Sequence, residues 1–383
     1  NKWLRAAYGE PLRKLLQGNA SMNQIVDFAG LPVFAEATVR TIIMICTPLQ
    51  KKSESIRYLP PVSLDEFYAI GDASDLKKLV DEKGMDIPAK NLSADGWSFS
   101  SAETSRAIQK IRDTSVTLKE YIKSEPYFGI KTGFNEAFII DGKKRKQLIA
   151  ENKGSKEIIK PLVVGKDVRR YSLEFKDSYM IWTYVGVPIE KYPSVLKHLK
   201  KYQKELEKRW DQGNHWWELR HCDYYDKFEG PKIIYPDIST TCRFTLDREG
   251  LFSSNTTYFI AADDLYLLGL LNSRIGLFYF KEVCAGLESS GATYLRFFGQ
   301  YMEDFPVRKV DLNNSEERGL RENLVSLVEK ELDLHKQLNK ASFDSEKEPI
   351  QRQVAATDKK IDELVYKLYG LTQEEIKIVE DNN

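Results

Sequence analysis

The residues that could do chemistry in this sequence are basic and hydroxyl-bearing side chains gathered in four short stretches. One is the turn-forming KTGFN at residues 131–135, and another is GLESSGATYLRFF at residues 286–298. The other two hold Lys166, Arg169 and Arg170, and Trp216, Trp217 and Arg220. Arginine forks and small hydroxyls suit phosphate oxygens and base edges. The stretches therefore indicate a surface for a polyanion, although a solvated face explains each lysine alone, and the tryptophans favour a core.

Charge is unevenly distributed along the chain, although the formal net charge is +0. Residues 143–209 contain 18 Lys and Arg against 8 Asp and Glu, a net charge of +10. Residues 311–383 contain 11 against 17, a net charge of −6. The basic part could serve a polyanion. With 383 residues, 42% of them hydrophobic, the chain is long enough for two or three folded domains.

Catalytic motifs are absent from the sequence, apart from a partial match to a metal-dependent nuclease. The chain contains no glycine-rich phosphate loop, no H-E-x-x-H and no G-x-S-x-G. Asp167, Glu174 and Lys176 loosely match the Asp…Glu-x-Lys set that holds Mg²⁺ in some nucleases, but their spacing leaves little room for the usual hairpin. An ordinary charged surface strand explains them better. The histidines and cysteines lack the paired short spacings of a zinc site, so we expect no metal.

The stretch KTGFN lies between two apolar runs, at 127–130 and 137–140, in the segment YFGIKTGFNEAFIID. Gly129 and Gly133 allow backbone angles that other residues avoid, so we predict a β-hairpin with an exposed polar turn. The turn is either an ordinary reversal of the chain or a contact for a polar partner.

A β-rich part follows, with predicted strands at 160–164, 178–184, 232–235 and 256–261. A helix beginning at Pro193 interrupts it. The buried stripe of this helix is predicted from apolar residues spaced by three and four positions, namely Val195, Leu199, Tyr202 and Leu206. Its lysines lie on or beside the opposite face, which is typical of a solvated helix.

The first 50 residues predict the edge of an α/β sheet. A helix beginning at Pro11 precedes two apolar runs, at 25–28 and 41–45, which we predict to be strands. Such a remnant cannot bury its own faces, so we expect earlier strands of the sheet to be missing. Residues 51–125 predict a polar linker followed by connecting helices.

Residues 311–383 predict a helical tail. Apolar residues recur at spacings of four and three along 320–338 and again along 354–368. This pattern is typical of two antiparallel helices that pair along a heptad seam. The turn-forming residues 342–349 separate the two helices.

The sequence predicts a cytoplasmic protein. The chain begins without Met or an apolar leader, so we expect no signal peptide. The most apolar run, at 258–280, is broken by charged residues such as Asp263 and Arg274, as in a core segment rather than a membrane span. The four cysteines are scattered without a CxxC pair, which favours a reducing compartment.

Five motifs, in this order, resemble one domain family: GIKTGFNEAFIID, IIKPLVVGKDVRRY, PKIIYPDIS, LLGLLNSRIGLFYF and YMEDFPV. The family is the target-recognition domain of type IIG restriction–modification enzymes and related adenine-N6 DNA methyltransferases. The ending IDELVYKLYGLTQEEIKIVE resembles the C-terminus of those proteins. The opening, through VDFAGLPVFAEATVRTIIMI, is similar to the last motifs of their methyltransferase domain. The resemblance is least clear over residues 50–125.

The resemblance implies a mixed α/β protein in four parts. Residues 1–50 would be the C-terminal edge of a methyltransferase domain, and 51–125 connecting helices. Residues 126–310 would recognise the DNA target, and 311–383 would form a helical hairpin. The family's motifs for S-adenosylmethionine and for the target amine lie upstream of residue 1, so we expect no catalytic residue and no cofactor here. S-adenosylmethionine, with Mg²⁺ if a nuclease is fused, would belong to the parent enzyme.

Site residues are implied by the same resemblance. Phe34 matches the phenylalanine of VF-x-x-A-x-V, a stacking platform for the extruded adenine, unless it is simply a core residue. Expected phosphate contacts are Lys131, Lys166, Arg169, Arg170 and Arg296. Expected readers of base edges are Thr132, Asn135, Ser289, Ser290 and Thr293.

The expected partners are double-stranded DNA and the methyltransferase domain of the same polypeptide, and no membrane. Two rival functions stay open at this point. One is a protein-interaction module that works through the heptad helices, and the other is a metal-dependent nuclease.

Overall fold

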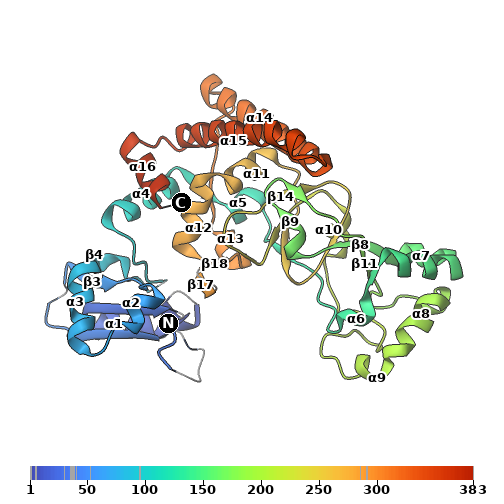
Figure 1. The fold of residues 1–383 in the computed structure, drawn as a ribbon, viewed down its shortest axis with the longest axis horizontal. Coiled ribbons are helices and arrows are strands. Elements are labelled where there is room, and N and C mark those ends of the chain that lie inside the picture. Colours follow the sequence, from blue (N-terminus) through green and yellow to red (C-terminus); the bar gives the residue numbers. More distant parts are fainter. Residues whose placement is uncertain are drawn as a thin grey trace. The chain divides into compact units, whose positions relative to one another are not determined.

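The structure, a computed structural model, describes residues 2–4, 7–29, 31–34, 39, 41–51, 53–94, 96–284, 286–289 and 292–382. It is of mixed α/β class, as predicted, and divides into two compact units (Figure 1). Unit 1 comprises residues 1–115, 274–296 and 369–383, and unit 2 comprises residues 116–273 and 297–368. This division differs from the four consecutive parts expected from the sequence, because segments far apart along the chain share a unit.

Unit 1 combines short helices with a small sheet. Its helices are α1 (Glu10–Asn19), α2 (Leu64–Tyr68), α3 (Ala73–Lys83), α4 (Ala102–Asp113), α12 (Arg274–Val283) and α16 (Gln373–Asp381), with 3₁₀ turns at Lys2–Leu4, Ala7–Gly9 and Ala89–Asn91. Its strands are β1 (Ala20–Ala29), β2 (Thr41–Pro48), β3 (Ser55–Leu59) and β4 (Met85–Pro88), in the order β2-β1-β3-β4, and the hairpin β17 (Gly286–Ser289) and β18 (Ala292–Arg296). The strand β5 (Ser115–Thr117) follows α4.

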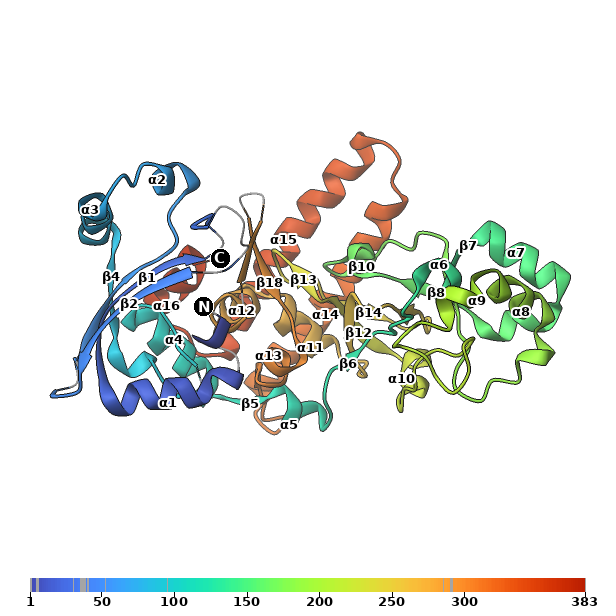
Figure 2. The same ribbon diagram turned by 90° about the horizontal axis from the view of Figure 1, so that it is seen from below.

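The sheet of unit 1 confirms two predicted strands and corrects the predicted linker. β1 and β2 lie side by side as an antiparallel pair, from Ala20 opposite Pro48 to Ala29 opposite Thr41 (Figure 2). β3 lies within the stretch expected to be a polar linker, yet it pairs in parallel with β1. Ile56 and Tyr58 are buried in one core cluster, and Leu59, on the opposite face, is buried in another. β3 is therefore an interior strand of this sheet, covered on both faces.

The end of the chain belongs to unit 1. The side chain of Thr372 accepts a hydrogen bond from the backbone of Glu375 and caps the start of α16. α16 packs against α4, where the ammonium of Lys110 lies 2.6 Å from the carboxylate of Glu375. The last helix therefore separates from the rest of the expected helical tail, which lies in unit 2.

Unit 2 contains the β-rich middle of the chain and the long helices. Its helices are α5 (Leu118–Ile122), α6 (Asn135–Phe138), α7 (Gly142–Glu151), α8 (Pro193–Leu199), α9 (Gln203–Leu206), α10 (Tyr225–Glu229), α11 (Leu265–Asn272), α13 (Gly299–Glu303), α14 (Ser315–Lys340) and α15 (Asp344–Leu368), with 3₁₀ turns at Lys153–Ile158, Gly165–Asp167, Ile189–Lys191 and Lys200–Tyr202. Its strands are β6 (Tyr127–Phe128), β7 (Ile139–Asp141), β8 (Ile159–Val163), β9 (Val168–Arg169), β10 (Ser172–Leu173), β11 (Ser178–Ile181), β12 (Lys232–Pro236), β13 (Ile238–Ser239), β14 (Thr245–Asp247), β15 (Phe252–Ser253), β16 (Thr257–Ile260) and β19 (Pro306–Arg308).

Two small sheets form the centre of unit 2, in the orders β15-β8-β11-β7 and β14-β12-β16-β6. They confirm the strands predicted in this part of the chain. Leu162, Met180, Phe252 and Phe259 contribute to a shared core that also receives the predicted apolar stripe. The single helix predicted for this stripe is interrupted, because α8 ends at Leu199 and a 3₁₀ turn at Lys200–Tyr202 precedes α9. Burial of this apolar surface is the main stabilising contribution to unit 2.

The predicted hairpin at residues 127–141 is wrong. β6 pairs with β16 and β7 pairs with β11, so the two strands belong to different sheets. Between them α6 forms a single helical turn in which Ala137 and Phe138 are both completely buried. Successive residues of a strand point to opposite faces, so a strand here would have turned one of these side chains away from the core.

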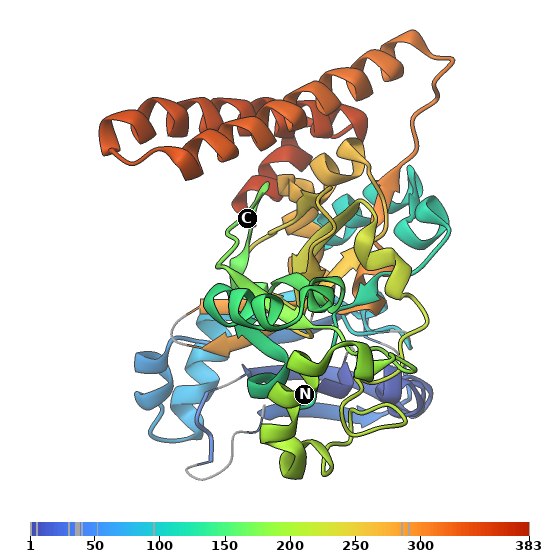
Figure 3. The same ribbon diagram turned by 90° about the vertical axis from the view of Figure 1, so that its right-hand side faces the viewer.

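The helical tail of unit 2 confirms the predicted antiparallel pair. α14 and α15 lie side by side (Figure 3), with Leu334 and Ile361 buried along the pair, whereas Leu324 is buried beside Gly269 of α11. The connection is shorter than predicted, because α15 begins at Asp344 and contains Pro349.

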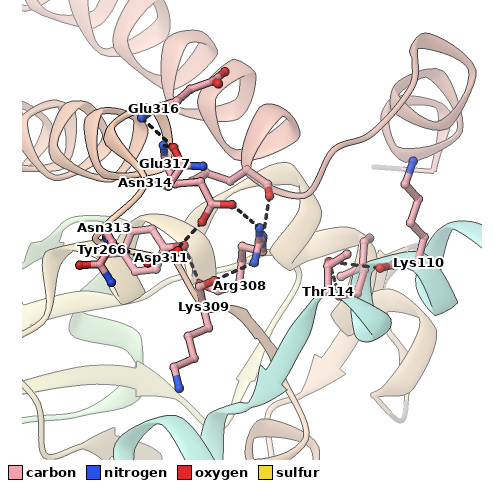
Figure 4. A network of polar contacts seen from close by, with 12 residues as sticks. Lys110, Thr114, Tyr266, Arg308, Lys309, Asp311, Asn313, Asn314, Glu316 and Glu317 are labelled. Carbon is pink, nitrogen blue, oxygen red and sulfur yellow. Dashed lines mark hydrogen bonds and ion pairs between the residues drawn. The ribbon is translucent and has the colours of Figure 1, made fainter.

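The start of α14 is fastened to β19 by a polar network (Figure 4). The guanidinium of Arg308 lies 2.9 Å from the carboxylate of Glu317 and also donates to the carbonyl of Lys309, and Asn314 caps the helix. None of the helices in the described ranges is both long and apolar enough to cross a membrane.

Candidate nucleic-acid interface

The polar turn at residues 131–135 is held open by its own side chains. Thr132 is only 2% exposed; its hydroxyl donates to Oδ1 of Asn135 at 2.6 Å and accepts from the N–H of Phe134 at 3.2 Å. Gly133 has a φ of +71°, and a Cβ there would come within 3.1 Å of Asp211. A side chain at this position would therefore strain the turn and crowd the neighbouring loop.

The neighbouring loop, residues 209–220, is organised around the buried carboxylate of Glu218. One oxygen of this carboxylate accepts from the N–H of Gly186 at 2.9 Å. The other accepts from the N–H groups of Asn214 at 2.7 Å and His215 at 3.0 Å. Hydrogen bonds from backbone N–H groups satisfy the charge, so the loop has a fixed shape although it contains little regular structure.

Arg209 joins the loop to the turn. It is 7% exposed and donates to the carbonyls of Thr132 at 2.5 Å, Trp216 at 2.8 Å and Glu218 at 2.8 Å. Its guanidinium carbon also lies 4.6 Å from the centre of the Phe138 ring. Burial lowers the pKa of Arg209 to about 10, and Asp211 opposes this shift. We call residues 131–135 and 209–220 together the Arg209 platform.

The outer side of the Arg209 platform presents cations, amides and one aromatic ring. Lys131 is 49% exposed and Arg220 is 66% exposed, and both form ion pairs with Asp211, at 2.9 and 3.7 Å. Asn135 is exposed and Trp210 is 98% exposed. Asp211 is largely buried, whereas the two cations keep much of their side-chain surface in water, so they stay accessible to a further anion. The platform can therefore offer two cations to phosphate oxygens and an amide to a base edge.

Further lysines lie on the helices of the same unit. α7 and α8 pack together (Figure 1) and carry exposed Lys143 and Lys146 on α7 and Lys197 on α8. The lysines that follow α8 are exposed as well: Lys200, Lys201, Lys204 and Lys208. They extend a positive potential beside the platform, although each alone is an ordinary solvated residue.

The predicted phosphate contacts near β9 differ in their exposure and in their partners. Lys166 is exposed. Arg169 is paired with Glu174, with 3.0 Å between Nε and Oε1. Arg170 is half-buried and donates to the carbonyl of Asn272 at 2.9 Å and to the carboxylate of Asp358 on α15. The guanidinium of Arg170 thus fastens α15 to the β-rich part of unit 2 and does not face outward as expected.

The other predicted residues lie in unit 1 or outside the described ranges. Within the stretch 286–298, expected to be a loop, Gly286–Ser289 and Ala292–Arg296 pair as the antiparallel strands β17 and β18, with the backbone of Ser289 in β17 and Thr293 and Arg296 in β18. Thr293 is exposed and Arg296 half-buried, whereas Ser290 lies outside the described residues. Phe34 is 54% exposed and therefore does not have the burial expected of a core residue.

The structure brings Lys131 and Asn135 together with residues that the sequence analysis missed or discounted. Arg209, Trp210 and Glu218 were overlooked because no local pattern in this polar run shows which side chains are buried and which are exposed. Trp216 and Trp217 are half-buried against the core, as expected. Thr132 is not available to a base edge in this conformation, because its hydroxyl supports the turn.

The candidate nuclease set does not form a metal site. Asp167 is buried and accepts from the N–H of Val164 at 3.0 Å. Glu174 is occupied by Arg169 and by Lys176, whose ammonium lies 3.1 Å away. Within the described ranges, no group of three or more His, Cys, Asp or Glu side chains is placed to hold a metal.

Comparison with known sequences matches most of the platform to a defined domain. Residues 160–307 match the TaqI-like C-terminal specificity domain, a range that includes the loop of the platform. The type II methyltransferase M.BanIII of Aneurinibacillus aneurinilyticus is 24% identical over 364 residues, which cover 83% of this chain and 61% of that protein. The type II methyltransferase M.XhoI of Xanthomonas vasicola is 22% identical, covering 79% and 56%. The chain thus spans about 60% of the length of these relatives.

A solved structure shares the fold. The type IIL restriction–modification enzyme MmeI, determined in complex with DNA, superposes with a TM-score of 0.61 at 14% sequence identity. The match covers 99% of this chain and 48% of MmeI.

Proposed function

We propose that this chain, whose residues 160–307 match the TaqI-like C-terminal specificity domain, selects the DNA sequence on which a restriction–modification methyltransferase acts. The observation that carries the proposal is the Arg209 platform. It is a rigid loop pair with exposed cations and an exposed amide, and its larger part lies within the specificity domain. Phosphate contacts from Lys131 and Arg220 would fix the position of the duplex, and Asn135 would read a base edge.

The finer assignments belong to the same proposal. The methylated base would be adenine at N6, and the exposed Phe34 of unit 1 would stack on it after extrusion. S-adenosylmethionine would supply the methyl group to the parent enzyme, and the described residues of this chain are assigned no part in holding it. The methyltransferase relatives support this reading, and double-stranded DNA is the partner it requires.

The rival functions have less support. The heptad residues of α14 and α15 bury one another, so their apolar seam is not offered to a partner protein. Asp167 is buried with one oxygen bonded to the backbone of Val164, and Glu174 is paired with Arg169. Within the described ranges neither acid belongs to a group of three side chains that could hold a metal, as such a nuclease requires.

Selection from a randomised pool of duplex DNA tests the proposed function. The chain should enrich a defined sequence, and Asn135→Ala should change the enriched sequence at one position more than it lowers overall affinity. Glu136→Ala, which removes the neighbouring exposed side chain, serves as the control and should leave the sequence unchanged. Failure of the unmodified chain to enrich any sequence would contradict the proposal.

A further inference from the structure

Trp210 is the most exposed large apolar residue of the described chain, at 98%. The other tryptophans are buried or half-buried: Trp3, Trp97, Trp182, Trp216 and Trp217. A tryptophan normally buries most of its ring, because its large apolar surface is costly to leave in water. The position of Trp210 therefore requires a physical reason.

The backbone on both sides of Trp210 is fixed. Arg209 is tied to several carbonyls of the platform, and Arg209 also donates to the carbonyl of Asp211 at 3.1 Å. The carboxylate of Asp211 is itself held by Lys131 and Arg220. These contacts hold the backbone at Trp210 in the arrangement in which its ring is 98% exposed. The fold thus holds an aromatic face outward on a rigid support.

The surroundings of Trp210 favour a charged aromatic ligand over an apolar one. Residues 197–220 contain seven Lys and Arg against four Asp and Glu, a net charge of +3. One of those four acids, Glu218, is buried and satisfied by backbone N–H groups. An exposed aromatic ring among lysines and arginines is the arrangement that binds unstacked nucleotides, because the ring stacks on a base while the cations hold its phosphates. An apolar protein partner would instead favour a platform with little charge.

We propose that Trp210 stacks on an unstacked base of bound DNA, so that the specificity domain takes a duplex whose base stack is opened beside the Arg209 platform. This inference rests on the proposed function and adds a position at which the DNA is deformed. A base has an aromatic face whatever its identity, so this contact would tolerate sequence changes. Trp210 would therefore contribute affinity for deformable DNA, while other platform residues read the sequence.

Binding of two DNA probes to the full chain tests the inference. The probes are a short duplex and the same duplex with a central bulge of unpaired bases, whose unstacking is already complete. Trp210→Ala should weaken binding of the bulged probe by roughly 5- to 150-fold, the range observed when one stacking aromatic is lost. Trp210→Phe should retain most of the affinity because it keeps a ring. Phe343→Ala, which removes another well-exposed aromatic of unit 2, should bind both probes like the unmodified chain.

A second readout separates stacking from a general loss of structure. Stacking on a base should quench tryptophan emission when DNA is added, and this quenching should be smaller in Trp210→Phe, although the variant still binds. Equal affinity of Trp210→Ala and the unmodified chain for both probes would overturn the inference while leaving a salt-dependent DNA interaction intact. Loss of self-association in Trp210→Ala, with DNA affinity unchanged, would also overturn it by assigning the ring to a protein contact. Absence of DNA binding by the unmodified chain would instead overturn the proposed function itself.

Discussion

The side chain of Arg209 holds the turn and the loop of the candidate interface together. A guanidinium has donors in a fixed fork, which lets this residue satisfy carbonyls on the turn and on the loop at the same time. Lysine could not reproduce this pattern, because its ammonium is a single compact donor group. The shape of the platform therefore depends on one buried cation more than on the exposed residues that would touch DNA.

Replacing Arg209 should destabilise unit 2. Arg209→Met removes the donors and leaves the buried carbonyls of Thr132 and Glu218 without them, so we expect the free energy of unfolding to fall by about 2–4 kcal/mol. Arg248→Met is the matched control, because Arg248 forms an exposed ion pair with Asp263. This replacement should lower the free energy of unfolding by less than about 1 kcal/mol. Chemical denaturation measures both. Equal losses in the two variants would show that Arg209 does not organise the platform.

At the scale of elements, the junction between α14, α15 and the β9–β10 turn contains an unusual buried acid. Glu331 of α14 is 0% exposed, and its carboxylate lies 3.5 Å from Nε2 of His335 on the same helix. Asp358 of α15, held by Arg170, adds a negative charge nearby. Burial, reinforced by the charge of Asp358, raises the pKa of Glu331 to about 8.

This raised pKa predicts a loss of stability with rising pH. In the unfolded chain Glu331 releases its proton near pH 4.5, whereas in the folded chain it keeps the proton up to about pH 8. The folded state binds more protons in this interval, so the free energy of unfolding falls as pH rises through it. His335 has a lowered pKa, and its effect has the opposite sign below pH 6.5. His198 also has a lowered pKa, and the opposing effect of both histidines fades only gradually above pH 6.5. The difference between the unmodified chain and Glu331→Gln, in which both histidines are unchanged, therefore isolates Glu331.

Denaturant unfolding at several pH values checks the prediction. Between pH 6.5 and 8 the unmodified chain should lose up to about 2 kcal/mol of stability, and Glu331→Gln should abolish most of this loss because its amide does not titrate. Glu329→Gln, on the exposed side of α14, should retain the full pH dependence. Parallel pH profiles for Glu331→Gln and Glu329→Gln would contradict the account of this junction.

Sequence patterns predicted those elements whose apolar residues form a regular spacing or an uninterrupted run within one short stretch of the chain. α8 follows from the spacing of its apolar residues, and β12 follows from a short apolar run. The hairpin at residues 127–141 failed because the partners of β6 and β7 are strands far along the chain, which no local pattern specifies. Arg209 and Glu218 were missed for the same reason. A buried charge is recognisable only when the groups that satisfy it are known.

At the scale of the whole molecule, the basic and the acidic residues lie in different elements. The basic residues of the middle segment lie in unit 2, on the platform and on α7 and α8, whereas the acidic end of the chain forms α14 to α16. The range that matches the TaqI-like C-terminal specificity domain includes residues from both units, and the chain spans only part of the length of its methyltransferase relatives. We therefore propose DNA recognition for this chain and methyl transfer for the parent enzyme.

The most direct test of the central claim is the salt dependence of duplex DNA binding between roughly 50 and 200 mM salt. Lys131→Ala with Arg220→Ala should weaken binding and reduce the slope of log affinity against log salt by about 2, close to one per lost phosphate contact. Lys347→Ala with Arg352→Ala, which removes an equivalent pair of ion-paired cations from α15, should leave both quantities unchanged. Indistinguishable slopes and affinities for the two double variants would contradict the claim that the Arg209 platform binds DNA.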